Sequence, residues 1–242
     1  MGLLDFFGGS KDPDKAVEKW RKRVTDPYRQ THERYQAMDE LVKAGTPAAL
    51  RALLQRFTIR VSSPTVDEEE KTYCYQLVAN WGDEAVAVLQ EFVRSNTAVY
   101  FPLRALRELA GDDVAVDTLI ETMRGCDPGY HGDLERLREL VSNLRDFRHE
   151  RVRDALAELI SSRSDEIRFY ALDGLAGYPN GEVAEFFALR IGDLQESQRV
   201  RTAACELAID HEMSFKKWAE QVAAGLGEGY RLNDRFQIER RG

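Results

Sequence analysis

The chain has 242 residues, of which 43% are hydrophobic and 31% charged, and its formal net charge is −8. This composition is typical of a folded protein with a well-solvated surface and excludes a disordered chain. The acidic total disfavours proteins that hold nucleic acid by its phosphates, because these usually carry a net basic face.

Cysteine usage and hydropathy point to the cytoplasm. Cys74, Cys126 and Cys205 are far apart and form no CxxC pair, which favours free thiols in a reducing compartment. No apolar run approaches the ~18 residues that are needed to cross a bilayer. The first residues lack the basic region of a signal peptide.

The N-terminal 27 residues divide into a peptide and a helix. Asp12 followed by Pro13 is a helix-start signal, and Val17, Trp20 and Val24 share one face of the helix that follows. We expect residues 12–27 to form a helical cap and residues 1–11 to form a flexible apolar peptide. Its apolar residues either pack on the first repeat or contact a partner or an anionic membrane; they are Leu3, Leu4, Phe6 and Phe7.

A repeat of about 29 to 37 residues runs through the chain. Turn-like clusters recur at Gly45, Gly82, Gly111, Asp146, Gly177 and Asp210, and each lies between segments with helical apolar spacing. One helical hairpin cannot bury its apolar face alone, so such units stack. The pattern predicts about six stacked hairpins over residues 28–226.

The best-formed unit spans residues 164–193. Ser164 can cap a helix in which Ile167, Ala171 and Leu175 lie on one face, and Gly177 ends it. Elsewhere residues 57–65 are β-branched and predict a longer loop between repeats. In the tail, residues 227–242, the alternation of Tyr230-Arg-Leu-Asn-Asp-Arg-Phe-Gln-Ile predicts a small β-hairpin.

The stretch Glu166-Ile-Arg-Phe-Tyr-Ala-Leu-Asp-Gly-Leu-Ala-Gly resembles the first helix of a HEAT repeat. Gly181-Glu-Val-Ala-Glu-Phe-Phe continues the resemblance, and Arg199-Val-Arg-Thr-Ala-Ala-Cys-Glu-Leu-Ala resembles the start of the next copy. The resemblance is best over residues 164–210 and weaker over residues 28–160. It implies an all-α, right-handed α-solenoid with an N-terminal helical cap, and repeats of this kind are mainly recognition scaffolds.

We therefore expect a non-catalytic protein–protein interaction scaffold without a cofactor. The second helix of each hairpin should line a concave surface that binds a protein or peptide with an acidic face, since arginine is enriched in interfaces. The same arginines could instead pair with acids on neighbouring helices for little energy. The residues expected on this surface are Arg51, Gln55, Gln90, Arg94, Glu121, Arg124, Arg153 and Arg190.

Two enzyme classes are alternatives. Deoxyhypusine hydroxylases are HEAT-type enzymes that bind two irons through His-Glu pairs, and DNA glycosylases of a HEAT-like class need a basic groove with aromatic residues. The tryptophans, Trp20, Trp81 and Trp218, each fit an apolar helix face instead. The His-Glu pairs are His32-Glu33, His149-Glu150 and His211-Glu212, which could also be surface residues at helix ends. No metal site is expected in the main interpretation, and a membrane-tethered adaptor is a third alternative.

Overall fold

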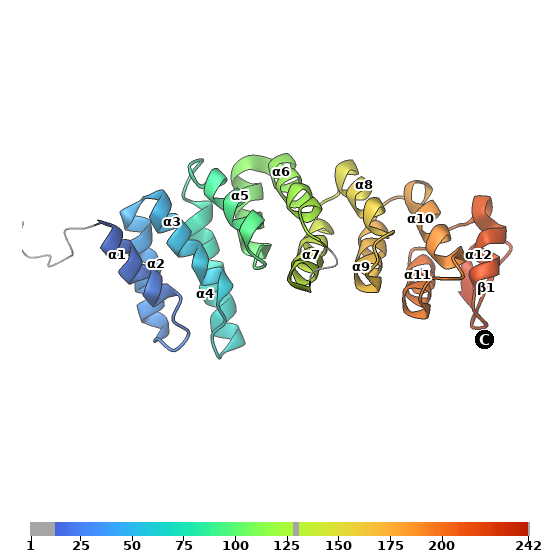
Figure 1. Cartoon of the computed structure of the whole chain (residues 1–242), viewed down its shortest axis with the longest axis horizontal. Helices are drawn as coiled ribbons and strands as arrows, with labels where there is room; N and C mark the ends of the chain where they lie inside the picture. Colours follow the sequence, from blue (N-terminus) through green and yellow to red (C-terminus); the bar gives the residue numbers. More distant parts are fainter. Residues whose placement is uncertain (1–12, 128–130, 242) are drawn as a thin grey trace, which may run out of the picture. The chain divides into compact units, whose positions relative to one another are not determined.

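A computed structural model describes residues 13–127 and 131–241 (Figure 1). Over these residues the chain is an all-α solenoid built from successive helix pairs, followed by a small C-terminal β-hairpin, as expected. The chain divides into two compact units, an N-terminal unit up to Thr118 and a C-terminal unit from Leu119. The expected apolar peptide with Leu3, Leu4, Phe6 and Phe7 lies outside the described residues. The domain boundaries drawn from the sequence stay a prediction.

The N-terminal unit begins with the expected helix, α1, which packs against both helices of the first pair. The first helices of successive pairs, α2 and α4, lie against one another, as do the second helices α3 and α5. The third pair is a single labelled helix, α6, that is interrupted at Gly111, whose φ of 85° breaks the helical path. The elements of this part of the chain are α1 (Pro13–Val24), α2 (Thr31–Ala44), α3 (Pro47–Leu54), the 3₁₀ turn η1 (Gln55–Thr58), α4 (Pro64–Ala79), α5 (Ala85–Ser95) and α6 (Tyr100–Arg124). The last residues of α6, 119–124, belong to the C-terminal unit.

Local chemistry explains where these helices start. Thr46 and Ser63 each accept a backbone hydrogen bond through their side chains, and a proline follows each of them at the first helical position. Gly45 ends α2 in the left-handed region, with φ 60°. The loop expected over residues 57–65 is shorter than predicted, because η1 extends α3 and the Ser63 cap starts α4 at Pro64. Only residues 59–63 are irregular.

The C-terminal unit repeats the arrangement. Helices α7, α9 and α11 lie in succession, and each second helix also contacts the first helix of the next pair. Ser164 caps α9 and Ser197 caps α11 through their side-chain oxygens. Ile167, Ala171 and Leu175 are fully buried, as their spacing predicts. The elements are α7 (His131–Leu144), α8 (Glu150–Leu159), α9 (Asp165–Leu175), α10 (Asn180–Gly192), α11 (Gln198–Asp210), the 3₁₀ turn η2 (Lys216–Trp218) and α12 (Ala219–Gly225).

A hairpin follows α12. Strands β1 (Tyr230–Leu232) and β2 (Ile238–Arg240) pair antiparallel, with Leu232 opposite Ile238. The Asn233 side-chain oxygen accepts hydrogen bonds from the backbone of Arg235 and Gln237 and so closes the turn. The predicted hairpin is confirmed, and Asn233 is the residue that forms its turn.

Polar side chains tie successive helix pairs together, and three of these contacts join residues 28 positions apart. Arg138 donates to Glu166 at 3.3 Å, and Arg168 donates to Glu196 at 2.6 Å; both pairs are 28 residues apart. In the N-terminal unit Gln90 donates to Thr118, also 28 residues later, at 3.1 Å. Each of these hydrogen bonds joins one helix pair to the next pair or to the loop that precedes it. None of the described helices is long and apolar enough to cross a membrane.

Candidate functional site

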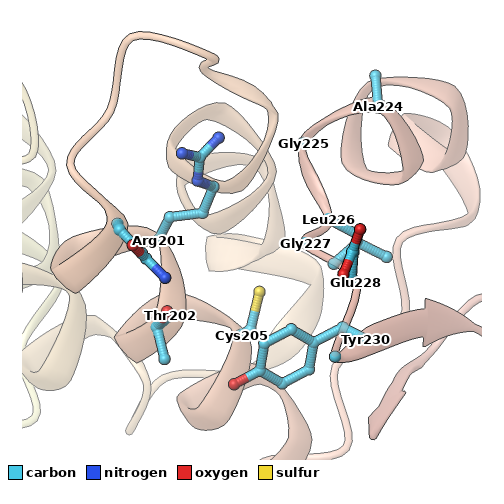
Figure 2. A pocket seen from close by; sticks show the side chains of 11 residues that line it. Arg201, Thr202, Cys205, Ala224, Gly225, Leu226, Gly227, Glu228 and Tyr230 are labelled. Carbon is cyan, nitrogen blue, oxygen red and sulfur yellow. The ribbon is translucent and has the colours of Figure 1, made fainter. Parts of the chain in front are cut away.

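A cavity of about 580 Å³ lies at the C-terminal end of the C-terminal unit (Figure 2). One wall is the first half of α11, and the other is the glycine-rich segment that joins α12 to β1. Burial raises the pKa of the Cys205 thiol, at its floor, to about 12, so this sulfur is not a nucleophile at neutral pH. The lining residues are Gln198, Arg201, Thr202, Cys205, Ala224, Gly225, Leu226, Gly227, Glu228, Gly229 and Tyr230.

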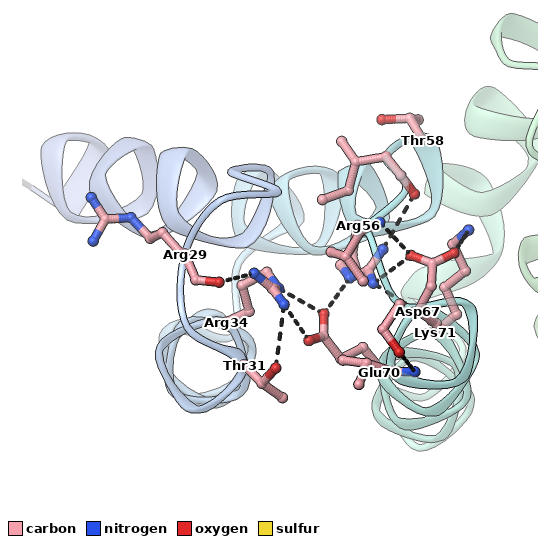
Figure 3. A network of polar contacts seen from close by, with 12 residues as sticks. Arg29, Thr31, Arg34, Arg56, Thr58, Asp67, Glu70 and Lys71 are labelled. Atoms are coloured by element: carbon pink, nitrogen blue, oxygen red, sulfur yellow. Dashed lines mark hydrogen bonds and ion pairs between the residues drawn. The ribbon is translucent and has the colours of Figure 1, made fainter.

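A buried ion network lies in the N-terminal unit, between the first and second helix pairs (Figure 3). The Glu70 carboxylate on α4 is fully buried and accepts hydrogen bonds from Arg34 at 2.8 and 2.7 Å. The Arg56 guanidinium, also fully buried, donates to the same carboxylate at 2.9 Å. Burying three charges is costly unless every group is paired, so this geometry has to be complete to be tolerated.

A second carboxylate completes the network. Asp67 accepts from Arg56 at 2.8 Å, from Lys71 at 2.6 Å and from the Val61 backbone at 3.1 Å. Burial raises the pKa of Asp67, but the hydrogen bonds from Lys71, Arg56 and Val61 together outweigh burial and hold the pKa below its ordinary value. Asp67 is therefore an anion in the folded protein at neutral pH.

The network also holds two loops, residues 25–30 between α1 and α2, and residues 59–63 before α4. Arg34 Nη1 donates to the backbone carbonyls of Asp26, at 3.4 Å, and Arg29. Arg56 Nη1 donates to the Ile59 carbonyl at 3.4 Å, and Asp67 fixes the Val61 amide. Buried charges thus determine the backbone positions of both loops.

A cavity of about 540 Å³ lies between these loops, and we name it the two-loop cavity. Three arginines and no acidic residue line it, although the protein as a whole carries a net charge of −8. Arg60 is exposed and has no ion-pair partner within residues 13–127 and 131–241. The Tyr28 side chain beside it is 94% exposed. The lining residues are Pro27, Tyr28, Arg29, Gln30, Thr31, Arg34, Arg60, Val61, Ser62, Ser63 and Val66.

Four arginines expected on the second helices form ion pairs with later elements of their own unit. Arg51 pairs with Glu91 at 2.8 Å and Arg124 pairs with Glu158 at 2.9 Å. The other two ion pairs are Arg153 with Glu182 at 2.6 Å and Arg190 with Glu196 at 3.3 Å. The first three pairs are at least partly exposed and are worth little energy, so they do not prevent those arginines from binding a partner. Arg190 and Glu196 are largely buried, so this pair holds Arg190 within the fold.

The other four expected residues also lie on second helices or directly after them. Arg94 on α5 and Glu121 on α6 are exposed, and Gln90 is half-buried and bonded to Thr118. Gln55 is half-buried at the start of η1. The binding role of this set of eight stays a prediction.

The histidines lie at helix ends or on the surface. His32 is exposed on α2, His149 caps α8 by accepting from the Arg151 amide at 3.1 Å, and His211 is exposed where α11 ends. Across the described residues, no three His, Cys, Asp or Glu side chains are grouped so that they could hold a metal ion. The alternative metal set, which also includes Glu33, Glu150 and Glu212, is thus not brought together as a ligand cluster there.

We did not predict Arg34, Arg56, Arg60 or Glu70 as site residues from the sequence. One signal was available: the loop segments Pro27-Tyr-Arg and Arg60-Val-Ser-Ser each place a basic residue and hydroxyl groups directly before a helix start. The buried pairing itself has no local pattern, because Arg34 and Glu70 are 36 residues apart.

Comparison with known proteins shows no family for this chain. No family model matches the chain, and no curated protein matches it. Human deoxyhypusine hydroxylase in complex with glycerol is similar in structure, with 15% identity, 86% of this chain and 88% of that chain covered, and a TM-score of 0.35. Two engineered proteins are similar at 13% and 14% identity, covering 86% and 87% of this chain and 84% and 72% of theirs, with TM-scores of 0.35 and 0.32.

The expectation of a non-catalytic scaffold is corrected by this comparison. It was deduced from the fold alone, and an enzyme, the hydroxylase, is among the solved structures with a similar helical arrangement. The fold therefore gives no ground for excluding catalysis. At this identity and TM-score the likeness concerns the fold only, and it assigns no activity to this chain.

Proposed function

We propose that the two-loop cavity binds an acidic side chain presented by a protein or peptide. The observation that carries this proposal is the lining of the cavity: arginines and hydroxyl groups without one carboxylate, in an acidic protein. The proposal describes a binding step and replaces the scaffold that we expected from the sequence.

The chemistry of the lining fits a carboxylate or a phosphorylated side chain. Arg60 offers a guanidinium that pairs with no acid among the described residues, and Ser62 lies two residues away with its hydroxyl. Arginine presents paired donors that match such anions. Arg29 adds charge, although it is shared with Asp26 at 3.3 Å and Glu33 at 3.0 Å.

A peptide fits better than a free ion because apolar surface surrounds the cationic lining. Pro27, Val61 and Val66 line the cavity, and the Tyr28 ring is almost entirely exposed. Exposed aromatic rings supply large contact area at low entropic cost in recognition surfaces. The residue next to the acidic side chain would pack on Tyr28.

The buried network supports the proposal because it positions both walls before a ligand arrives. Arg34 and Arg56 fix the loop carbonyls, and Asp67 fixes the Val61 amide. A preorganised site loses less conformational entropy on binding. This accounts for the presence of a costly ion cluster beneath an open cavity.

The test is fluorescence anisotropy with a peptide array in which each sequence occurs with one glutamate, one phosphoserine or one alanine at its centre. We expect the peptides with glutamate or phosphoserine to bind. Arg60→Gln should weaken their affinity about tenfold, roughly 1.4 kcal/mol. The matched control is Arg107→Gln, an exposed arginine of the same unit that pairs with Asp112 and does not line the cavity. Equal losses for the two variants, or equal binding of the alanine members, would exclude the proposal.

Two further assignments belong to the proposal. We place the helix pairs in the HEAT class, supported by the 166–177 segment and by the succession of stacked helix pairs. We place the protein in the cytoplasm, supported by three free cysteines, Cys74, Cys126 and Cys205.

A further inference from the structure

The cavity at the C-terminal end of the C-terminal unit carries two opposite charges on its two walls (Figure 2). Arg201 projects from α11, and Glu228 lies on the glycine-rich segment that faces it. Arg201 Nη2 donates to the Glu196 backbone carbonyl at 3.3 Å, which anchors one edge of the guanidinium and leaves Nε and Nη1 without a partner among the described residues. Within the described parts of the chain, Glu228 has no partner.

The rest of the lining is apolar or neutral. The Tyr230 ring lies beside the buried Cys205 thiol, and Leu226 and Ala224 complete the apolar part. Tyr230 itself is held in place because its hydroxyl donates to Glu206 at 2.5 Å. The ring therefore offers a fixed face for an apolar or aromatic group.

The volume of the cavity, about 580 Å³, lies within the range of small-molecule sites, and its open side gives access from solvent. A ligand that matches this lining carries a negative group, a positive group and an apolar body. A ligand with only a negative group would place that group near the Glu228 carboxylate, which repels it. A ligand with only a positive group would be repelled by the Arg201 guanidinium.

We propose that this cavity binds a free α-amino acid with an aromatic or large aliphatic side chain. Arg201 takes the carboxylate through its free guanidinium edge, and Glu228 takes the ammonium group. The side chain packs on Tyr230, Leu226 and Cys205. The site is one of binding, because the Cys205 thiol and the Tyr230 phenol both have a pKa raised to about 12 and stay protonated at neutral pH.

The test uses the full chain and three ligands that differ by one charged group: L-phenylalanine, 3-phenylpropionate and 2-phenylethylamine. Amide chemical-shift titration gives the dissociation constant of each ligand and the residues that respond. We expect saturable binding of L-phenylalanine with shifts at residues 198–205 and 224–230. Each single-charge analogue should bind at least tenfold more weakly.

Two substitutions assign the charges. Glu228→Gln should remove the preference for L-phenylalanine over 3-phenylpropionate, and Arg201→Gln should remove its preference over 2-phenylethylamine. Arg199→Gln, on α11, is the matched control for Arg201→Gln, and Glu220→Gln, on α12, is the matched control for Glu228→Gln. Both residues are exposed, and neither lines the cavity. The Glu228 side chain is exposed and has no partner among the described residues, so its variant decides the question if Arg201→Gln folds poorly.

Three results would overturn the proposal: no saturable response to L-phenylalanine, binding of 3-phenylpropionate as tight as that of L-phenylalanine, or equal effects of Glu228→Gln and Glu220→Gln. This cavity belongs to the C-terminal unit and the two-loop cavity belongs to the N-terminal unit. The outcome of the amino-acid titration is therefore independent of the outcome of the peptide-binding test.

Discussion

Glu70 and Glu196 hold the same chemical position in the two units. Each is a buried carboxylate that is bound by two arginines of the preceding helix pair. Glu70 is held by Arg34 and Arg56, at 2.7 and 2.9 Å. Glu196 is held at 2.6 Å by Arg168 and at 3.3 Å by Arg190. In each unit one anion thus joins both helices of a pair to the segment that follows.

Removing the Glu70 charge should destabilise the N-terminal unit strongly. Glu70→Gln leaves the buried Arg34 guanidinium without a counter-charge and leaves Arg56 with Asp67 alone. Breaking a buried pair in this way costs about 3–5 kcal/mol. Urea unfolding followed by circular dichroism measures the change. The adjacent exposed Glu69→Gln is the control and should change the unfolding free energy by less than about 0.5 kcal/mol. Similar values for both variants would show that the network contributes no stability.

Replacing the three most deeply buried charges of the network by apolar residues should separate stability from loop positioning, and it leaves Asp67 paired with Lys71. The triple variant Arg34→Met, Arg56→Met, Glu70→Leu removes all three charges together, which is often neutral or stabilising. It also removes the hydrogen bonds to the carbonyls of Asp26 and Ile59. We expect near-wild-type unfolding free energy with weakened binding of acidic peptides. Unchanged peptide binding would show that the loops need no support from the network.

The contribution of Asp67 should depend on pH. Its pKa is lowered in the folded protein, so its contribution is fully present above the unfolded value of about 3.9 and is lost as pH falls through the folded value. The free-energy difference between wild type and Asp67→Asn should therefore be constant near neutral pH and shrink as the pH falls below about 4. Unfolding titrations at a series of pH values test this. The exposed Glu68→Gln should show no such trend, and a constant Asp67→Asn difference would contradict the assignment.

Close backbone packing makes Gly225 intolerant of a side chain. A Cβ atom there would overlap the carbonyl oxygen of Ile191, which is backbone and cannot move aside. Gly225→Ala should destabilise the C-terminal unit by about 1–3 kcal/mol or more and should disturb the cavity that Gly225 lines. Gly227→Ala is the control, because a Cβ atom at Gly227 meets nothing within 4 Å. Thermal unfolding measures the midpoint of each variant. Equal midpoints for Gly225→Ala and Gly227→Ala would contradict the close packing of Gly225 against Ile191.

The three thiols should react in a fixed order. Burial raises the pKa of Cys74 and Cys205, and both side chains are almost completely enclosed. Cys126 is only half-buried, so it should be the first to be alkylated by iodoacetamide at pH 8. Mass spectrometry should find one modified cysteine in the native protein and three in denaturant. Rapid native labelling of Cys205 would show that the cavity floor is open.

The sequence predicted those parts of the fold that depend on local signals. Ser164 starts α9, Gly45 ends α2, and Asn233 closes the hairpin, because a cap or turn residue acts within about four positions of itself. The loop over residues 57–65 was predicted too long. Its β-branched residues indicated extended chain, whereas tertiary contacts of Arg56 and Phe57, both buried, continue the helix into η1.

The candidate sites could not be predicted in the same way. Glu70 ends the acidic run Asp67-Glu-Glu-Glu, which reads as a solvated helix face, yet its side chain is fully buried. Its burial depends on two arginines that approach from 36 and 14 residues away. The His-Glu pairs drew attention for their chemistry, but a dipeptide pattern carries no information on whether distant copies meet.

The paired side chains also give the C-terminal unit a direction. In Arg138–Glu166 and Arg168–Glu196 the cation comes first along the chain and the acid one helix pair later. At Glu206 on α11 this order is reversed, since the donors Tyr230 and Arg240 come from the hairpin that follows. The hairpin thus supplies the donors that neutralise Glu206 and covers part of α11. A chain shortened before residue 230 would leave the Glu206 carboxylate without both donors and would expose the part of α11 that β2 contacts.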